Sequence, residues 1–526
     1  MNIALLKEEL ISQKYNSIIK NKNELYVDSD ISNVKELVNT FLSKYKLKFI
    51  AEFCNEDFTK ADLENNFIIN IIFTNSKEGY FVVLRYETKE EIISLQDALF
   101  QSHLFEREIS DLFGLKIVDG IDKRELVKHE KWQKDIYPLR KSFPHGAKLQ
   151  EKDEIPPYKF KEIAGDGAYQ IPVGPVHAGI IEPGHFRFSV IGEPIENLEI
   201  RLNYKHRGIE KLCENIEANQ LNLLFERMAC ESSVAYAESY ALLVEKLLNF
   251  NVPNEIKALR VVLLELERIY NFLGDIAGIC VDVGFSYPAK KYGYFQEQIH
   301  QLCERITGSR FMRNAITPCG INIDFRKEQI EDIKATLEGL KNRMNKIIGI
   351  TLDTVSFLDR VENTGIVRNK TARKLYMTGV VGRASRINYD VRKSFPYEIY
   401  EMFKNSNNVE EIGGVFERYK LKISEIWDAF KFISISLDCI TKDIIKTKNQ
   451  FNLVEGTEAL TAVETVKGEL IVYGQVGKNN KFNRIYFKTP SFTNWNGLTY
   501  AVLGEIVPDF PLCNKSFNMS YSENDK

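Results

Sequence analysis

Hydrophobic positions change their spacing several times along this chain of 526 residues. Apolar side chains recur every three to four positions, as in amphipathic helices, at 3–20, 33–46 and 89–113. Short, nearly continuous apolar runs, as in buried strands, lie at 47–54, 66–74 and 79–87. The mixture predicts an N-terminal α/β unit built around an antiparallel sheet.

A different pattern follows residue 146. The segment 147–169 carries many charges, Pro156-Pro157 and Gly165-Asp-Gly167, which together indicate a linker. Strand-like spacing then runs to about residue 204. Helical spacing follows at 221–249, 255–280 and 396–450, and strand-like spacing returns at 461–474 and 482–488. The fold class predicted is α+β, with an N-terminal domain at 1–146 and a mostly helical domain with a small β cap at 170–526.

Composition excludes several classes of protein. Lys plus Arg number 70 and Asp plus Glu 73, a balance that argues against a nucleic-acid partner. No apolar run approaches the ~20 residues that span a bilayer, and the start shows no secretion signal. Any membrane association is therefore expected to come through partner subunits. The eight cysteines lie singly, which predicts reduced thiols rather than disulfides, zinc or iron–sulfur ligands.

The helical pattern near residue 110 ends in a dense charge cluster that Gly114 closes as a C-cap. By itself the cluster is typical of a solvated helix face, with Arg107 paired to Asp111. The stretch from Glu106 to Gly114 also resembles the signature of the thirty-kilodalton subunit of respiratory complex I. The Pro-Leu-Arg-Lys segment at 138–141 resembles the C-terminal part of that subunit. The resemblance implies a docking domain rather than a catalytic one.

The segments 174–187 and 204–211 combine glycine and proline turns with histidine, arginine and glutamate. Together they resemble the opening of the forty-nine-kilodalton subunit of complex I and of its relatives, the large subunits of membrane-bound NiFe-hydrogenases of the formate hydrogenlyase type. In those relatives the segments line a cavity that holds quinone or metal. The resemblance implies cavity-lining roles for His177, His206, Arg207 and Glu210. By residue type alone, the last three also fit a buried structural network of ion pairs.

Further matches continue toward the C-terminus. Asp390 and Arg392 lie in a segment that resembles the Asp-x-Arg element shared by complex I and these hydrogenases. The stretch 464–469 resembles the strand that presents an arginine to nickel, and Lys467 stands in place of that arginine. The exchange is not conservative, because lysine lacks the planar guanidinium fork. The fused order of the two subunit-like parts is typical of formate hydrogenlyase large subunits.

The nickel-ligand positions are the main departure from the resemblance. A nickel centre of this type needs four soft thiolates. The positions where the family carries them read Ala229, Ser232, Ser520 and Glu523. Alanine offers no donor and neutral serine is a poor one. The sequence therefore predicts that no NiFe centre and no other cofactor is held in this chain.

Other ligands for the same cavity are left open. Cys230 stands where complex I has a tyrosine that contacts the quinone, and Tyr236 stands where hydrogenases have a histidine. Tyr236 or Tyr240 is an alternative contact for a quinone headgroup. A mixed oxygen and sulfur site for magnesium or manganese is a further alternative, from Ser232, Glu523, Glu226 and Cys230. No Gly-x-Gly-x-x-Gly sequence opens a βαβ unit, so direct dinucleotide binding has no support.

The resemblance implies a subunit of a membrane-associated oxidoreductase that couples electron transfer, linked to quinone, ferredoxin or NADH, to ion translocation. It implies an iron–sulfur small subunit, similar to the twenty-kilodalton subunit of complex I, and antiporter-like membrane subunits as partners. The cluster would lie in that partner, and this chain would sit peripherally on the cytoplasmic face of the inner membrane. Charged or proton-relaying roles are expected for His177, His206, Glu210, Asp390 and Arg392. A true NiFe-hydrogenase and a non-catalytic scaffold are the alternatives.

Overall fold

The N-terminal unit is an α/β sandwich in a computed structural model that describes residues 2–56, 66–147, 157–176, 181–403, 408–447 and 450–526. Its elements are α1 (Ile3–Ser12), β1 (Asn16–Lys20), β2 (Glu24–Asp28), η1 (Ile31–Asn33), α2 (Val34–Ser43), β3 (Lys48–Glu56), β4 (Phe67–Asn75), β5 (Tyr80–Thr88), β6 (Glu91–Ile93), α3 (Ser102–Phe113) and β7 (Lys116–Val118). The main sheet has the strand order β1-β2-β5-β4-β3. The strands predicted at 47–54, 66–74 and 79–87 are confirmed as β3, β4 and β5.

Three predictions for this unit are wrong. The helix predicted at 3–20 ends at Ser12, because residues from Asn16 onward turn back through left-handed Asn21 and Lys22 and pair with β2. The sheet is mixed, since β2 pairs with β5 in parallel. The helix predicted at 89–113 is only α3, because residues 91–93 pair with β7 instead. In the two predicted helices, strand pairing overrides the local helical pattern.

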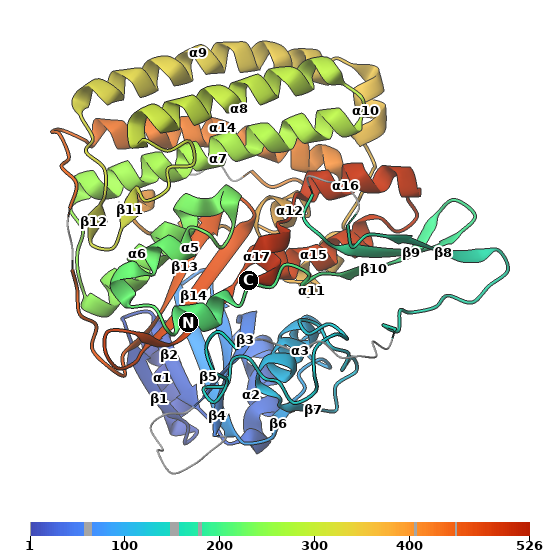
Figure 1. Ribbon diagram of the computed structural model, residues 1–526, viewed down its shortest axis with the longest axis vertical. Coiled ribbons are helices and arrows are strands. Elements are labelled where there is room, and N and C mark those ends of the chain that lie inside the picture. Colours follow the sequence, from blue (N-terminus) through green and yellow to red (C-terminus); the bar gives the residue numbers. More distant parts are fainter. Residues whose placement is uncertain (1, 57–65, 148–156, 177–180, 404–407, 448–449) are drawn as a thin grey trace.

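The second part opens with a three-stranded antiparallel sheet that extends away from the helices in Figure 1. Its strands are β8 (Ala168–Val173), β9 (His185–Ile191) and β10 (Ile195–Arg201). The elements up to the long helices are α4 (Ile209–Cys213), η2 (Ala218–Gln220), α5 (Asn222–Phe225), η3 (Cys230–Ser232) and α6 (Ser233–Leu248). The helix predicted at 221–249 is therefore interrupted before Ser233, in the segment that resembles the first nickel-ligand motif.

Long helices form a layer at the top of Figure 1. They are α7 (Asn254–Asp282), α8 (Ser286–Thr307), α9 (Lys327–Leu352) and α14 (Val415–Asp438). Between and after them lie β11 (Ile316–Thr317), β12 (Gly320–Ile321), α10 (Val355–Val361), α11 (Asn369–Lys374), α12 (Gly379–Ala384), α13 (Val391–Ser394) and η4 (Tyr400–Met402). Helix α7 packs on both α8 and α14 and is buried along most of its length. The helix predicted at 255–280 is confirmed, whereas only α14 forms within 396–450.

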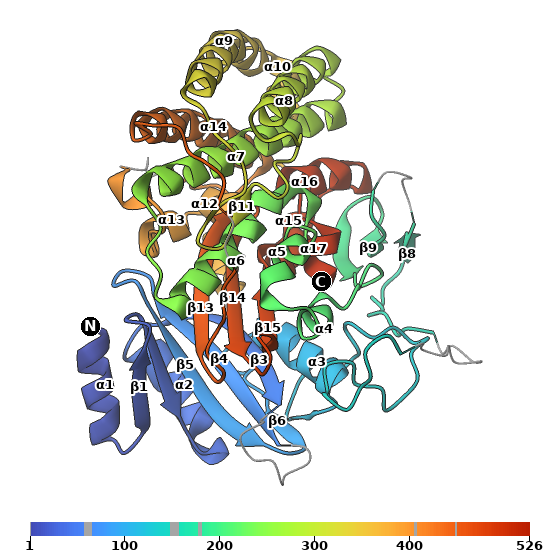
Figure 2. The same ribbon diagram turned by 60° about the vertical axis from the view of Figure 1, so that its left-hand side comes forward.

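A small antiparallel sheet lies between the N-terminal sheet and the helices, as Figure 2 shows. Its strands are β13 (Glu458–Thr465), β14 (Gly468–Val476) and β15 (Phe482–Lys488). The predicted small sheet is confirmed, but the single strand predicted at 461–474 is two strands joined at Val466 and Lys467. All eight residues of β13 are buried, so the sheet is a central layer rather than a cap. The chain ends in α15 (Pro490–Ala501), η5 (Val507–Asp509), α16 (Phe510–Phe517) and α17 (Tyr521–Asp525).

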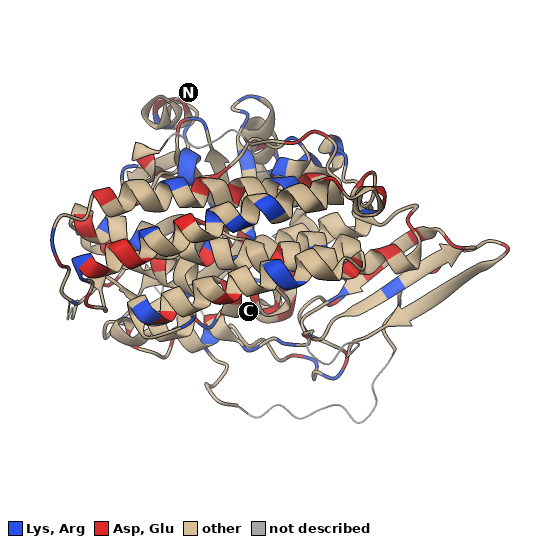
Figure 3. Ribbon diagram, turned by 90° about the horizontal axis from the view of Figure 1, so that it is seen from above, with Lys and Arg blue, Asp and Glu red and all other residues tan. Residues whose placement is uncertain are grey.

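The surface agrees with the near-zero charge balance. Seen from above, the long helices carry acidic and basic positions side by side (Figure 3), with no large field of one sign. Within the described part of the chain, no helix is both long and apolar enough to cross a membrane. All eight cysteines are free thiols, and six of them are buried; Cys230 is exposed and Cys439 is partly buried.

Candidate functional site

The two segments that resemble nickel-ligand motifs meet through Arg207. Its guanidinium donates to the carbonyl oxygens of Arg227 at 2.7 Å and Met228 at 2.8 Å, just before Ala229. The same group donates to the carbonyl of Ser522 at 2.9 Å, in α17. One arginine therefore ties both segments together, and it does so through backbone oxygens rather than through a ligand.

Glu523 occupies the centre of this junction with a fully buried carboxyl. The Tyr236 hydroxyl donates to its Oε1 at 3.0 Å. The Ser491 N–H donates to Oε2 at 3.2 Å, and the Ser491 hydroxyl donates to the same oxygen. Burial raises the pKa of Glu523 to about 7, against the lowering effect of the Ser491 hydrogen bond. The carboxyl thus has internal partners on both oxygens and titrates near neutral pH.

The donor set does not fit a NiFe centre. Ala229 has no donor atom, and Glu523 has its oxygens engaged by Tyr236 and Ser491. Ser520 is the N-cap of α17, with its hydroxyl accepting from the Glu523 N–H at 3.3 Å. The Ser232 hydroxyl is buried and has no hydrogen-bond partner. Across the residues that the structure describes, no cluster of three or more His, Cys, Asp and Glu side chains is placed to hold a metal ion.

Lys467 reaches the same region from the β13–β14 turn. It is 4% exposed, and its charge lowers the pKa of Glu523, so the two side chains lie near each other. Its Nζ lies 4.0 Å from Asp275 Oδ1, while Lys422 Nζ lies 2.5 Å from the other oxygen of that carboxylate. The charge of this lysine is partly neutralised by Asp275.

His206 and Glu210 lie on the side of the junction that faces the N-terminal unit. His206 Nδ1 is 2.7 Å from the Asp525 carbonyl, and burial lowers the pKa of the imidazole. Glu210 pairs with Arg484 at 2.7 Å and with Lys526 at 3.2 Å. The expected network of buried ion pairs is present for Glu210, and it involves partners outside its own motif.

Asp390 and Arg392 belong to a second buried cluster. Asp390 caps α13 by accepting from the Arg392 N–H at 2.9 Å, and the two side chains pair at 2.7 Å. Three arginines and four carboxylates make up the cluster: Arg268, Arg383, Arg392, Glu265, Asp390, Glu425 and Glu464. Burial raises the pKa of Glu464 to about 7, and the charge of Asp390 adds to the effect. The cluster adjoins the Glu523 junction through β13, since Glu464 precedes Lys467 by three positions.

The residues of the proposed mixed metal site are not brought together. Cys230 is exposed, with Arg313 Nη2 at 3.3 Å from its sulfur. Glu226 accepts from the Asn314 N–H at 2.6 Å, and burial raises its pKa to about 7. The Tyr240 hydroxyl donates to the carbonyl of Ala218, which gives this tyrosine a structural role. His177 lies outside the described residues.

Three residues of the site were not assigned by the sequence. Ser491 donates a hydrogen bond to Glu523. Glu267 accepts from the N–H groups of Val234 and Ala235 and so caps α6. Lys526, a basic residue three positions after Glu523, reaches Glu210 and Glu108.

Replacing Arg207 with methionine is expected to loosen α17. The change removes three charge-assisted hydrogen bonds, which each contribute about 1.5–3 kcal/mol before water replaces them at this exposed side chain. Amide hydrogen exchange in 521–526 should therefore become faster. Arg227→Met is the matched control, because Arg227 donates to Leu223 within its own segment. Equal exchange in both variants would contradict the bridging role of Arg207.

Two family descriptions match this chain. Residues 27–148 match "Respiratory-chain NADH dehydrogenase, 30 Kd subunit". Residues 282–455 and 443–526 match "Respiratory-chain NADH dehydrogenase, 49 Kd subunit". The two matches follow each other in the order expected from the sequence motifs.

Individual relatives match most of the chain. It is 30% identical over 424 residues to hydrogenase-4 component G of Escherichia coli, covering 80% of this chain and 73% of the relative. It is 28% identical over 424 residues to formate hydrogenlyase subunit 5 of Escherichia coli, and the match covers 80% of this chain and 74% of that relative. It is 27% identical over 421 residues to the C/D subunit of NADH-quinone oxidoreductase from Phocaeicola vulgatus, covering 76% and 80%.

Proposed function

Because the chain belongs to the complex I-like family of fused thirty- and forty-nine-kilodalton subunits of membrane-associated hydrogenases and NADH-quinone oxidoreductases, we propose that it works without a NiFe centre. In this proposal it is an electron-transfer or energy-coupling subunit of such a complex. Electrons linked to quinone, ferredoxin or NADH would be coupled to ion translocation by the assembly. In this respect the proposal separates the protein from the relative that is named as a hydrogenase component.

The observation that carries the proposal is the state of Glu523. A carboxyl stands where the family carries its last thiolate, and Tyr236 and Ser491 occupy both of its oxygens. A nickel ion bound there would have to displace these partners and to accept hard oxygen donors in place of thiolates. Instead, the site offers a buried acid that titrates near neutral pH. Such a group is suited to proton transfer.

Roles for the remaining residues follow from their contacts. Arg207 and Glu210 hold the segments around Glu523 in place, and Lys467 supplies positive charge beside Glu523. Asp390 and Arg392 belong to the adjoining cluster, where ionisable groups pass charge or protons. His206 and Tyr236 face the junction as hydrogen-bonding groups. His177 and Cys230 remain candidates for the contact with a redox partner or quinone.

The family membership also supports the proposed surroundings. We infer an iron–sulfur small subunit that carries the cluster, and antiporter-like membrane subunits. Relatives are named as parts of formate hydrogenlyase and NADH-quinone oxidoreductase, which are assemblies of several subunits. This chain would then lie peripherally at the cytoplasmic face of the inner membrane, held there by its partners.

The first test is the nickel and iron content of the native complex, purified from its own host. We expect iron from the partner's cluster and no nickel above trace amounts, because the pocket lacks thiolates. About one nickel per chain would overturn the proposal and make the protein a true NiFe-hydrogenase.

A second measurement separates the electron-transfer subunit from a scaffold. The scaffold alternative is favoured by the internal hydrogen bonds of Glu523, because each of its carboxyl oxygens already accepts from a neighbouring side chain or backbone group. The complex is assayed for reduction of quinone and of ferredoxin, with Glu523→Gln as the variant. Activity that the variant changes supports a redox pocket. Activity that the variant leaves unaltered supports a scaffold.

A further inference from the structure

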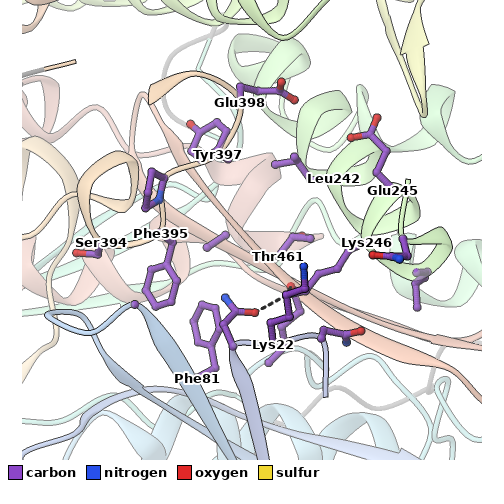
Figure 4. A pocket seen from close by; sticks show the side chains of 18 of the residues that line it. Lys22, Phe81, Leu242, Glu245, Lys246, Ser394, Phe395, Tyr397, Glu398 and Thr461 are labelled. Carbon is purple, nitrogen blue, oxygen red and sulfur yellow. Dashed lines mark hydrogen bonds between the residues drawn. The ribbon is translucent and has the colours of Figure 1, made fainter. Parts of the chain in front are cut away.

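A cavity of about 830 Å³ opens between the N-terminal unit and the helices, and Glu523 is not part of its lining. Figure 4 shows its lining from close by, with the rings of Phe81 and Phe395 on one side and the carboxyl groups of Glu245 and Glu398 on another. The two rings stack with centroids 4.2 Å apart and join the N-terminal sheet to the segment after α13. The cavity therefore lies beside two carboxylates of the helical part.

Behind these carboxylates lies Arg260, a guanidinium with no solvent exposure. It pairs with Glu245 at 2.6 Å and with Glu398 at 2.9 Å, and Glu238 lies 3.8 Å away. Glu238 and Glu245 are seven positions apart on α6, so both point from one helix face toward α7. One positive charge is thus surrounded by three buried carboxyl groups. If all three carboxyl groups were ionised, the single guanidinium could not compensate their buried negative charge.

The hydrogen-bond pattern identifies the surplus group. Both carboxyl oxygens of Glu238 are buried without a partner, and so is Oε2 of Glu398. Yet both carboxyl groups flank the same nitrogen of Arg260, with Glu238 Oε1 at 3.8 Å and Glu398 Oε1 at 2.9 Å from Nη1. Two carboxylates only accept, whereas a carboxylic acid also donates. A single proton placed between Glu238 and Glu398 converts the contact into a hydrogen bond and removes the repulsion.

The backbone holds Glu398 in place for this contact. Its φ is 51°, in the left-handed region that side chains other than glycine rarely adopt. Such a conformation costs on the order of 1–3 kcal/mol and persists where the surroundings require it. Its side chain is only 1% exposed although it lines the cavity. The carboxyl pair is therefore a positioned feature of the fold.

We propose that Glu238 and Glu398 hold one proton between them at neutral pH and exchange it with the water of the cavity, so that the pair is a proton-loading site of this protein. The groups that face the pair are Arg260, Glu245 and Tyr397, and beyond Tyr397 lie Arg268, Glu265 and Arg392. On the cavity side the charged groups are Lys22, Lys77, Glu78, Lys246 and Lys257. Burial raises the pKa of Glu238 well above its ordinary value, and the neighbouring Glu398 raises it further.

The pair also lies at the outer end of a series of buried polar groups. The rings of Tyr397 and Tyr400 are 4.8 Å apart, and the Tyr400 hydroxyl donates to Glu265 at 2.5 Å. Glu265 belongs to the cluster that includes Asp390, Arg392 and Glu464. A use of this series to supply protons to the Glu523 pocket rests on the proposed function. The proton-loading site itself does not.

Infrared spectroscopy of the full chain tests the proposal directly. At neutral pH the wild-type protein should show the carbonyl stretch of protonated carboxyl groups. Subtracting the spectrum of Glu238→Gln, or of Glu398→Gln, should each reveal the loss of one such group. The double variant should lose the same single group, because one proton is shared. Glutamine is the neutral isostere of the protonated acid, so the fold is retained.

Glu78→Gln is the matched control, because it removes an exposed carboxyl from the same cavity and should leave the band intact. No loss in either single variant, or a loss of two groups in the double variant, would overturn the shared proton.

The access of solvent to the pair is tested by transfer into D₂O. The carbonyl band should shift promptly in the wild-type protein and more slowly when Leu242→Trp fills the cavity. Equal rates would overturn the exchange through the cavity. None of these spectra requires an electron donor, so they stand whether or not electron transfer is found.

Discussion

Lys526→Met is expected to lower the free energy of unfolding by about 3–5 kcal/mol, the usual cost of removing one partner from a buried ion pair. Lys526 is 3% exposed, and its Nζ lies 2.7 Å from Glu108 Oε1 and 3.2 Å from Glu210 Oε1. Glu108 belongs to the N-terminal unit and Glu210 to the second part, so the lysine joins the two. Without it, Glu108 keeps no cation at hydrogen-bonding distance, because Arg484 pairs with Glu210 instead.

The loss should depend on pH. Burial already raises the pKa of Glu108, and removing the nearby ammonium raises it further. Above the ordinary pKa of a glutamate the variant must either bury a charge or bind a proton, so the destabilisation is larger at about pH 8 than at about pH 5. Urea unfolding of the full chain at both pH values measures it.

Lys205→Met is the matched control for this experiment. Lys205 pairs with Glu182 at 2.5 Å, with 43% and 31% of the two side chains exposed. Exposed pairs contribute only about 0–1 kcal/mol. A Lys526→Met variant that unfolds at the same urea concentration as Lys205→Met would refute the role of Lys526 as a bridge between the two parts.

Glu523→Gln is expected to remove part of the pH dependence of stability. The folded pKa of about 7 lies above the ordinary value of 4.5, so the folded state holds a proton that the unfolded state has already lost. Stability contributed in this way is complete below about pH 4.5 and is lost as the pH rises through about 7. The difference between the two pKa values corresponds to about 3 kcal/mol.

The variant should therefore be more stable than wild type by about 3 kcal/mol at about pH 8, with little difference at about pH 5. Glutamine imitates the protonated acid, because its amide oxygen can accept from Ser491 while its NH2 group donates to the Tyr236 hydroxyl. Urea titrations at a series of pH values give the two curves. Glu217→Gln, an exposed carboxyl, is the control and should run parallel to wild type. A Glu523→Gln curve parallel to wild type would show that this carboxyl is ionised in both states.

The spacing of apolar residues predicted helices and strands correctly where the side chains that it marks are buried. The strands β3, β4 and β5 and the helix α7 form where their apolar runs lie, since these segments are buried on the faces that the pattern marks. The pattern failed at 3–20 and 89–113, where residues that could extend a helix pair with a strand instead. The choice between these two states depends on a partner that is distant in the sequence or on a turn conformation, and periodicity records neither.

The chemistry of the site divides in the same way. The sequence by itself determined which donor atoms are available, because Ala229, Ser232, Ser520 and Glu523 cannot supply thiolates in any fold. Only the tertiary structure decided what these residues do instead. Tyr236 lies 287 positions from Glu523, yet its hydroxyl donates to that carboxyl. Lys526 likewise reaches Glu108 from the far end of the chain. Residue identity sets the possible interactions, whereas distance and burial, which set pKa and pairing energy, arise from packing between remote segments.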